Sequence, residues 1–417
     1  MSDTVEFGGW PRPPRWVWVV AGVAVVAVLA GVVVARTGTR HAAVSSPSRS
    51  PRAAASLVPR SRTPAEPAAR WPSAAAACGS TVELPQIHLA RQHADVHGRV
   101  LVGGTGLRQV ALGGAVSGPL RGLPGPGWLV TSVVAGPGAA YAFDVPCFSS
   151  SAHVRVYRIV AGAAHRLPIT ADALLGGPHH AWAVTYRAQH TVLTPPAGGR
   201  AVSFKSNISA VADTAAGLVL AAYHDSAGRP DIVELVDPKA GAVLRRLGGG
   251  SAMGAAGHVL LVSRHACAWP PAYGTCTLES IDLTTGRPIA TAELPAGRIP
   301  VWGDVPSPVF NPGGTLAAFQ LGRARPDSRF AAAAPGPPSD VAVLHLRTGR
   351  LDIVPGLELP PRTWAGLAFD ATGSWLLATV GEGHRGELLA WRQGMPGPAL
   401  VTRLPGPLLG PPPLLPG

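Results

Sequence analysis

The densest group of histidines in this chain is the first feature whose spacing suggests chemistry. His88, His93 and His97 lie close together, and a spacing of four residues would place His93 and His97 on one face of a helix, as metal ligands often lie. The segment has no helical apolar stripe, however, and it continues into the predicted strand 99–102. We therefore interpret these residues as surface-loop histidines and predict no metal site.

Carboxylates are the second group of residues that could do chemistry. Hydrolases that use paired carboxylates hold them at a fixed separation, and the candidates here are Asp144, Asp213, Asp225, Asp304 and Asp370. Asp370 and, more faintly, Asp213 belong to Asp-x-x-Gly patterns, which favours a turn-forming role. His179 and His180 follow Gly-Gly-Pro, which predicts a turn with exposed imidazoles. No Gly-x-Ser-x-Gly elbow exists, and no lysine follows a glycine-rich phosphate loop. The sequence thus predicts no catalytic residue and no cofactor.

Four cysteines suggest disulfides rather than catalysis. Cys267 and Cys276 flank Pro-Pro and Tyr-Gly in a predicted hairpin, so their sulfurs can face each other, and closing so short a loop stabilises by about 2–3 kcal/mol in the chain-entropy model. By elimination Cys78 would pair with Cys147, although four cysteines allow three pairings. A zinc site is the alternative, but the spacing matches no ribbon or finger.

Charge and composition exclude some classes of partner. The formal net charge is +12, and residues 36–77 carry seven arginines against the single Glu66. The remaining positive charge is dilute and lacks a basic stripe with interleaved aromatic residues, so we predict no nucleic-acid binding. With 47% apolar and only 14% charged residues, the rest of the chain can form a folded core.

An uncharged apolar run predicts one membrane span. Residues 16–35 form a stretch long enough to cross a hydrocarbon layer of about 30 Å as a helix. Trp16 and Trp18 lie at one end, where amphipathic rings prefer the interface. A cleaved signal peptide is the alternative, since Val33-x-Ala35 resembles a peptidase site, but the run is longer than a signal core.

The flanking segments bear on orientation. Residues 1–15 form a short tail, and residues 36–77 form an Ala/Ser/Pro/Arg linker that cannot bury enough surface to order itself. The positive-inside rule, taken literally, would keep the arginine-rich C-terminal side in the cytoplasm. The paired cysteines favour the opposite orientation. We therefore expect a cell-membrane protein with its C-terminal domain outside the cytoplasm, and a cytoplasm-facing scaffold is the alternative.

Downstream of the linker, one hairpin pattern repeats. An alternating strand, a polar turn with glycine and a second alternating strand occur at 233–247, 278–294 and 341–354. A second pattern, apolar-Phe-Asn/Asp-x-x-Gly-x-x-Leu-Ala, occurs at 309–319 and 367–379. Two hairpins in each period of 40–50 residues are typical of a four-stranded propeller blade.

These repeats predict an all-β protein with a β-propeller of about seven blades over residues 78–405, preceded by one transmembrane helix and a disordered linker. The expected blades are 87–127, 128–168, 169–205, 206–248, 249–299, 300–361 and 362–405. We expect residues 81–84 to pair beside residues 399–402 and close the ring. Residues 406–417 should form a loose Pro-rich tail.

The chain resembles bacterial TolB-like and WD40-like β-propeller repeats through residues 310–315 (FNPGGT), 369–374 (FDATGS) and 282–287 (DLTTGR). The resemblance covers about 205–405 and is thin over 80–205, and no Gly-His…Trp-Asp pair occurs. It implies a monomeric binding or scaffold module that recognises a protein or envelope ligand through its loops. A propeller-fold hydrolase or lactonase with a site in the central channel is the alternative.

Overall fold

The computed structural model of the protein divides the chain into two units, Met1–Ala68 and Ala69–Gly417. It describes residues 86–417 of the second unit, apart from 91–93, 105, 114–115, 124–127, 147–153, 188–189, 206–207, 223–231, 265–266, 268–274, 301–307, 324–337, 361–362, 364, 383–384, 406–413 and 417. The predicted tail, membrane span 16–35, linker and Cys78 lie outside the described residues. Within the described part of the chain, no helix is long and apolar enough to span a membrane.

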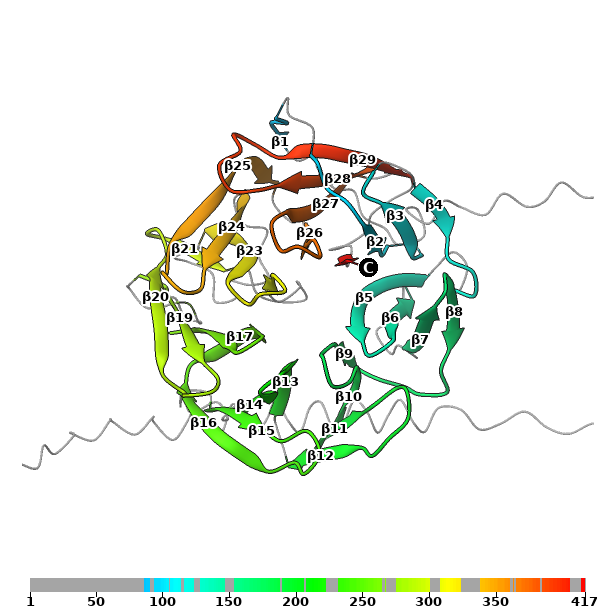
Figure 1. Ribbon diagram of the computed structural model, residues 1–417, viewed down its shortest axis with the longest axis vertical. Helices are drawn as coiled ribbons and strands as arrows, with labels where there is room; N and C mark the ends of the chain where they lie inside the picture. The colour runs from blue at the N-terminus through cyan, green and yellow to red at the C-terminus, as the bar shows by residue number, and fades with distance from the viewer. Residues whose placement is uncertain are drawn as a thin grey trace, which may run out of the picture. The chain divides into compact units, whose positions relative to one another are not determined.

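The described strands form sheets arranged radially around a centre, which is the architecture of a β-propeller (Figure 1). Six sheets have four strands, here given from the centre outward: β30 (Leu414–Pro416), β2 (Arg99–Val102), β3 (Arg108–Ala111), β4 (Val116–Pro119); β5 (Trp128–Gly136), β6 (Ala139–Pro146), β7 (Arg155–Val160), β8 (Ala163–Arg166); β9 (Ala173–Leu175), β10 (Trp182–Arg187), β11 (His190–Thr194), β12 (Val202–Lys205); β13 (Ile208–Thr214), β14 (Gly217–Ala222), β15 (Ile232–Val236), β16 (Val243–Gly249); β17 (Ser251–Ala256), β18 (Val259–Ser263), β19 (Thr277–Asp282), β20 (Pro288–Glu293); and β26 (Gly366–Phe369), β27 (Leu376–Glu382), β28 (Arg385–Trp391), β29 (Ala399–Pro405).

The remaining sheet has six strands and interrupts this regularity. Its members are β21 (Arg298–Pro300), β22 (Val309–Phe310), β23 (Leu316–Arg323), β24 (Ser339–His345), β25 (Leu351–Leu359) and β1 (Gln86–Ile87). The expectation of an all-β propeller is confirmed, but six regular four-stranded blades are present instead of the expected seven. The difference arises because β21 and β1 join the sheet that the sequence treated as an ordinary blade.

The repeated glycine turns form as the sequence predicts. The backbone N–H of Gly241, Gly286 and Gly349 donates to the carbonyl oxygen four residues earlier over 2.8, 2.7 and 2.9 Å, respectively. All three glycines have φ near +70°, which a side chain disfavours. In one turn the Asp282 carboxylate also accepts hydrogen bonds from the N–H groups of Thr284 and Thr285, of which Thr285 contributes most to lowering the Asp282 pKa. Each turn therefore joins the third and fourth strands of a sheet.

These turns also join neighbouring sheets. A Cβ atom placed on Gly349 would lie 2.2 Å from the carbonyl oxygen of Thr291, on the outer strand β20 of the preceding blade. Gly286 lies similarly against Arg245 of β16, whose guanidinium donates to the carbonyl oxygen of Thr285 over 2.7 Å. Glycine at position 349 thus lets its hairpin approach the backbone of the preceding blade.

A C-terminal strand completes the first blade, and the predicted closure by residues 81–84 falls outside the described residues. Strand β29 pairs with β28 through Ala390 and Ala399, and the expected partner segment 81–84 lies outside the described residues. Leu414–Pro416, expected in a loose tail, forms β30 and pairs with Val100–Val102 as the innermost strand of the first blade. The distant C-terminal segment supplies this strand because the first blade otherwise has only β2–β4.

The N-terminal end of the described chain forms a second fastening. Strand β1 pairs with the outer edge of β25, and the N–H of His88 donates to the carbonyl oxygen of Gly356. Two residues later, the N–H of Ala90 donates to the carbonyl oxygen of Pro398, at the next blade. This segment therefore bridges the last two sheets before the chain enters β2.

Candidate functional site

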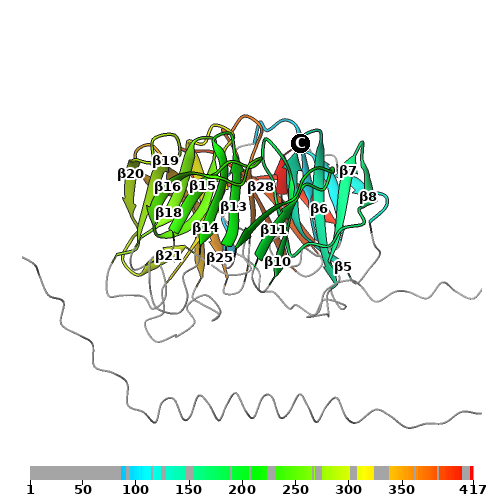
Figure 2. The ribbon, with the colours of Figure 1, turned by 90° about the horizontal axis from the view of Figure 1, so that it is seen from below.

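The antiparallel blades give the propeller two faces that differ in the lengths of their connections (Figure 2). We call the face where the second strand of each blade leads into the third the long-connection face, because the intervening segments there include 223–231, 264–276 and 324–338. The opposite face, here called the short-turn face, carries tight hairpins such as 137–138, 215–216 and 257–258. Recognition in propellers is expected where connections vary in length.

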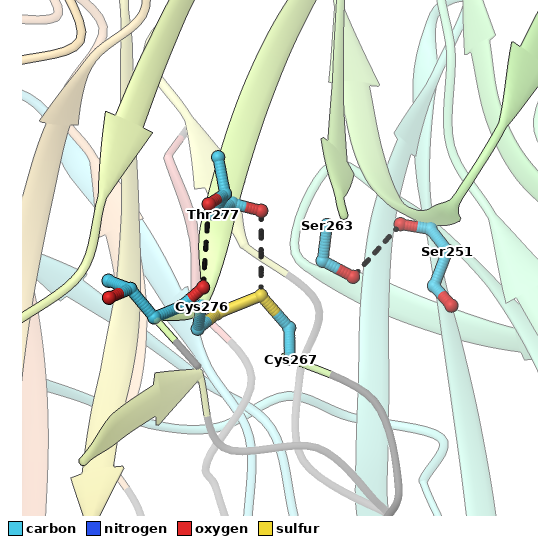
Figure 3. Close-up of a disulfide and its surroundings, with 6 residues drawn as sticks. Ser251, Ser263, Cys267, Cys276 and Thr277 are labelled. Carbon is cyan, nitrogen blue, oxygen red and sulfur yellow. Dashed lines mark hydrogen bonds between the residues drawn. A yellow bond between two sulfur atoms is a disulfide. The ribbon is translucent and has the colours of Figure 1, made fainter. Parts of the chain in front are cut away.

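A disulfide lies at the base of one long connection (Figure 3). Cys267 and Cys276 are joined, which is the pairing that the sequence predicted, and both side chains are buried. The Sγ atom of Cys267 lies 3.4 Å from the carbonyl oxygen of Thr277, at the start of β19. The bridge therefore ties both ends of segment 268–275 to the blade core. Cys147, the other predicted partner, lies outside the described residues, as Cys78 does.

The predicted carboxylates do not gather at one place within the described part of the chain. Asp370 caps its own turn, accepting hydrogen bonds from the N–H groups of Ser374 and Trp375, both over 3.0 Å. Asp144 and Asp213 lie in different blades, and Asp225 and Asp304 are outside the described residues. Among the described residues, no three His, Cys, Asp or Glu side chains are placed to hold a metal ion.

The predicted histidine cluster is also separated. His97 pairs with Asp95 over 2.9 Å, and both side chains are almost fully exposed. His88 belongs to the segment that fastens the last two sheets, and His93 is outside the described residues. The two described histidines therefore lie in non-helical segments.

Asp213 proved to have a different role from the predicted turn. Its side chain is fully buried, and it accepts hydrogen bonds from the backbone N–H of His180 over 3.0 Å and from the indole N–H of Trp182 over 3.2 Å. His179 Nδ1 lies 3.0 Å from the other carboxylate oxygen. Asp213 lies near the end of the inner strand β13. His179 and His180 come from the connection after β9, the inner strand of the preceding blade, and Trp182 begins β10.

The His179–Asp213 pair, here called the dyad, has a geometry that chemistry can use. A carboxylate only accepts hydrogen bonds, so Nδ1 carries the proton and Nε2 of the neutral ring is left as a base. The imidazole is 40% exposed whereas its carboxylate partner is 0% exposed, so the orienting group is shielded and part of the imidazole side chain reaches solvent. The sequence indicated an exposed His179, but the separation of 34 residues gave no signal for the partner.

Asp144 is a second buried carboxylate, without the partners that Asp213 has. Its side chain is 0% exposed, and neither oxygen has a hydrogen-bond partner. Burial raises its pKa to about 6. The nearby positive charge of Arg155 and, to a smaller extent, the backbone N–H of Arg155, the hydroxyl of Tyr157 and the charge of Arg166 only partly offset this effect. The Arg155 guanidinium stacks 3.4 Å from the centroid of the Trp128 ring instead.

A cavity of about 200 Å³ opens on the short-turn face between the six-stranded sheet and the blade β26–β29. We call it the inter-blade cavity. Its floor is apolar and buried, formed by Val343, Phe369, Leu376 and Trp391.

The rim of the inter-blade cavity is polar. It includes His345, Asp352, Ser374, Arg392 and Gln393. Arg350 Nη2 lies 3.0 Å from Asp352 Oδ2 and 2.8 Å from His345 Nε2. His345 Nε2 also lies 2.9 Å from Asp352 Oδ2, so these three side chains form one polar cluster.

No protein-family model and no curated relative matches the chain. The chain is similar to solved β-propellers, among them TolB from Acinetobacter baumannii (14% identity, TM-score 0.37, covering 76% of this chain and 65% of that one). It is also similar to a candidate 6-phosphogluconolactonase from Bacteroides uniformis (12%, 0.47, 77% and 99%) and to the WD40 domain of Toxoplasma gondii coronin (8%, 0.40, 78% and 78%). At these identities the similarity concerns the fold alone.

Proposed function

We propose that this protein is a single-pass membrane protein whose propeller acts outside the cytoplasm as a binding or scaffold module. The observation that carries the proposal is the asymmetry between the two faces. Connections on the long-connection face vary in length, from the two residues 188–189 to the long segment 324–338. A buried disulfide ties one of these connections to the core. A rigid ring that carries variable connections on one face is suited to recognition.

The cellular location rests on two sequence features and the disulfide. The apolar run 16–35 supports an anchor, and the arginine-rich linker 36–77 separates it from the propeller. The Cys267–Cys276 bridge supports an oxidising compartment, since disulfides persist mainly in exported proteins. The partner is a protein or an envelope ligand.

Site-specific photocrosslinking in cells tests the binding function. A photoreactive amino acid at position 328, in the connection 324–338, should yield an adduct of discrete mass. The matched control places the same group at Lys239, an exposed residue in the short turn between β15 and β16. Adducts from position 328 alone are expected. No adduct from either position, or equal adducts from both, would contradict recognition by the long-connection face.

A hydrolase is the second candidate, and the dyad is the observation that favours it. A partly exposed imidazole held by a buried carboxylate is arranged to act as a general base toward water. The test is hydrolysis of p-nitrophenyl acetate and of a simple δ-lactone by the full-length protein. His179→Ala should abolish any turnover, and His165→Ala, at an exposed histidine of β8, should not. Equal rates in both variants would remove the dyad from consideration.

A further inference from the structure

The inter-blade cavity has polar groups on its rim whose capacity to bind a ligand is not taken up by contacts within the protein. Its volume of about 200 Å³ is below the roughly 300–1,000 Å³ of sites for drug-sized ligands. Phe369 and Trp391 supply aromatic surface to its floor, and the Trp391 indole N–H already donates to the carbonyl oxygen of Met395. The floor therefore offers apolar contact, and a ligand that fits must be small and apolar on the side that meets it.

The charges at the mouth of the cavity do not balance. Asp352 is neutralised by Arg350, whose Nη2 lies 3.0 Å from the carboxylate. Arg392 has no carboxylate partner among the residues that the structure describes. Its guanidinium lies 4.9 Å from the centroid of the Trp375 ring, and such stacking leaves N–H groups at its edge available to an anion. One positive charge at the mouth is therefore uncompensated.

Uncharged polar groups on the rim complete an anion-binding set. The Ser374 hydroxyl and the Gln393 amide line the same cavity as Arg392 and can donate hydrogen bonds. Asp352 lies on the rim as well, but its charge is paired with Arg350, so Arg392 is the one arginine of the cavity lining left for an anion. A monoanion thus matches the single uncompensated arginine better than a phosphate dianion does.

We infer that the inter-blade cavity binds a small monocarboxylate, with its apolar body against Phe369 and Trp391 and its carboxylate paired with Arg392. This site lies on the short-turn face, so it is independent of recognition by the long-connection face. The ligand class follows from three observations together: the volume, the aromatic floor and the one uncompensated guanidinium.

Fluorine NMR of two matched probes tests the inference. The full-length protein in phospholipid nanodiscs is titrated with 4-fluorobenzoate and with its neutral analogue, 4-fluorobenzamide. Because a charge-assisted pair is lost with the amide, the acid should bind at least about tenfold more tightly. Arg392→Gln should weaken acid binding at least about tenfold and leave amide binding unchanged.

Two further variants separate binding from folding. Arg403→Gln changes an arginine that is 80% exposed on β29 of the same blade, and it should leave both affinities unchanged. Val343→Phe fills the floor and should abolish binding of both probes, with folding checked by the melting temperature. Equal affinity for acid and amide, an unaffected Arg392→Gln variant, or no acid binding up to about 10 mM would overturn the inference. Tighter binding of 4-fluorophenyl phosphate than of the acid would overturn the assignment of a monoanion.

Discussion

At the scale of single residues, two buried aspartates have opposite environments. Asp213 accepts three hydrogen bonds, from an imidazole, a backbone N–H and an indole N–H. Asp144 is equally buried, and its side-chain oxygens have no hydrogen-bond partner. Arg155 lies opposite it on the neighbouring strand β7. Hydrogen-bond donors stabilise an ionised carboxylate, and desolvation destabilises it. We therefore expect Asp213 to stabilise the folded state and ionised Asp144 to destabilise it.

Removal of the Asp144 charge should therefore stabilise the protein, with a defined pH dependence. The folded pKa of about 6 lies above the model value of 3.8, so the ionised form is penalised in the folded state at neutral pH. Wild-type stability should rise as pH falls from 7 through 6 and level off near 4. Asp144→Asn should add about 3 kcal/mol at pH 8 and nothing near pH 4. Thermal unfolding of the full-length protein between pH 4 and 8 measures this effect.

The matched control for that measurement is Asp95→Asn, at an 88% exposed carboxylate. It should leave the melting temperature unchanged at every pH. If Asp144→Asn lowered the melting temperature throughout the range, the carboxylate would be making a favourable interaction, contrary to its lack of hydrogen-bond partners.

At the scale of elements, the hairpin turns contribute both to their own blade and to packing against the preceding one. The turn at Gly349 needs φ of +72° for its local hydrogen bond, and it also needs room against Thr291 of the preceding blade. Local turn chemistry and inter-blade packing thus require the same residue. The repeated glycine in the sequence therefore reflects both requirements.

Gly349→Ala should separate these two requirements when it is compared with Gly162→Ala. Both glycines have φ above +70°, but a Cβ atom on Gly162 would meet no atom within 4 Å, whereas on Gly349 it would meet the Thr291 carbonyl oxygen. Gly162→Ala should cost about 1 kcal/mol from backbone strain, and Gly349→Ala about 3 kcal/mol or more. Melting temperatures of the two variants test this order, and equal losses would show that the close approach is relieved at little cost.

Strand β30 is the element on which closure depends. Leu415 packs against the core between the first two blades and pairs with Leu101. Leu415→Asp should destabilise the protein by about 2–4 kcal/mol because it places a charge against apolar side chains. Val243→Asp, at a half-exposed position on the outer strand β16, is the control and should have little effect. The melting temperature distinguishes them, and an unaffected Leu415→Asp variant would show that β30 is dispensable.

At the scale of the whole molecule, the proposed function depends on the orientation of the protein in the membrane. If the propeller lies outside the cytoplasm, protease treatment of intact cells should remove it and leave a tag at residue 1 intact. Peptide mapping without reduction should then recover Cys267 joined to Cys276. Survival of the propeller until lysis would instead support the cytoplasm-facing alternative, and free thiols at both positions would remove the disulfide as support for export.

Much of the fold follows from the sequence because its determinants are local. Asp282, Thr285 and Gly286 form their turn within five residues, and Cys267 and Cys276 flank a single connection, so spacing alone predicts both features. The alternating strands on either side likewise record which face is buried. The sequence by itself thus determined the propeller architecture, the hairpins and the short disulfide.

Only the tertiary structure decided the features that join distant segments. Leu414–Pro416 enters the first blade, Asp213 binds the turn at His179, and residues of two sheets surround the inter-blade cavity. A turn or a strand carries its signature in neighbouring residues, but a contact between blades leaves no periodic pattern in either partner. Similar Asp/Gly patterns, Asp-x-x-Gly at Asp370 and Asp-x-x-x-Gly at Asp213, therefore accompany a local turn in one case and a contact between blades in the other. The packing of the blades distinguishes them.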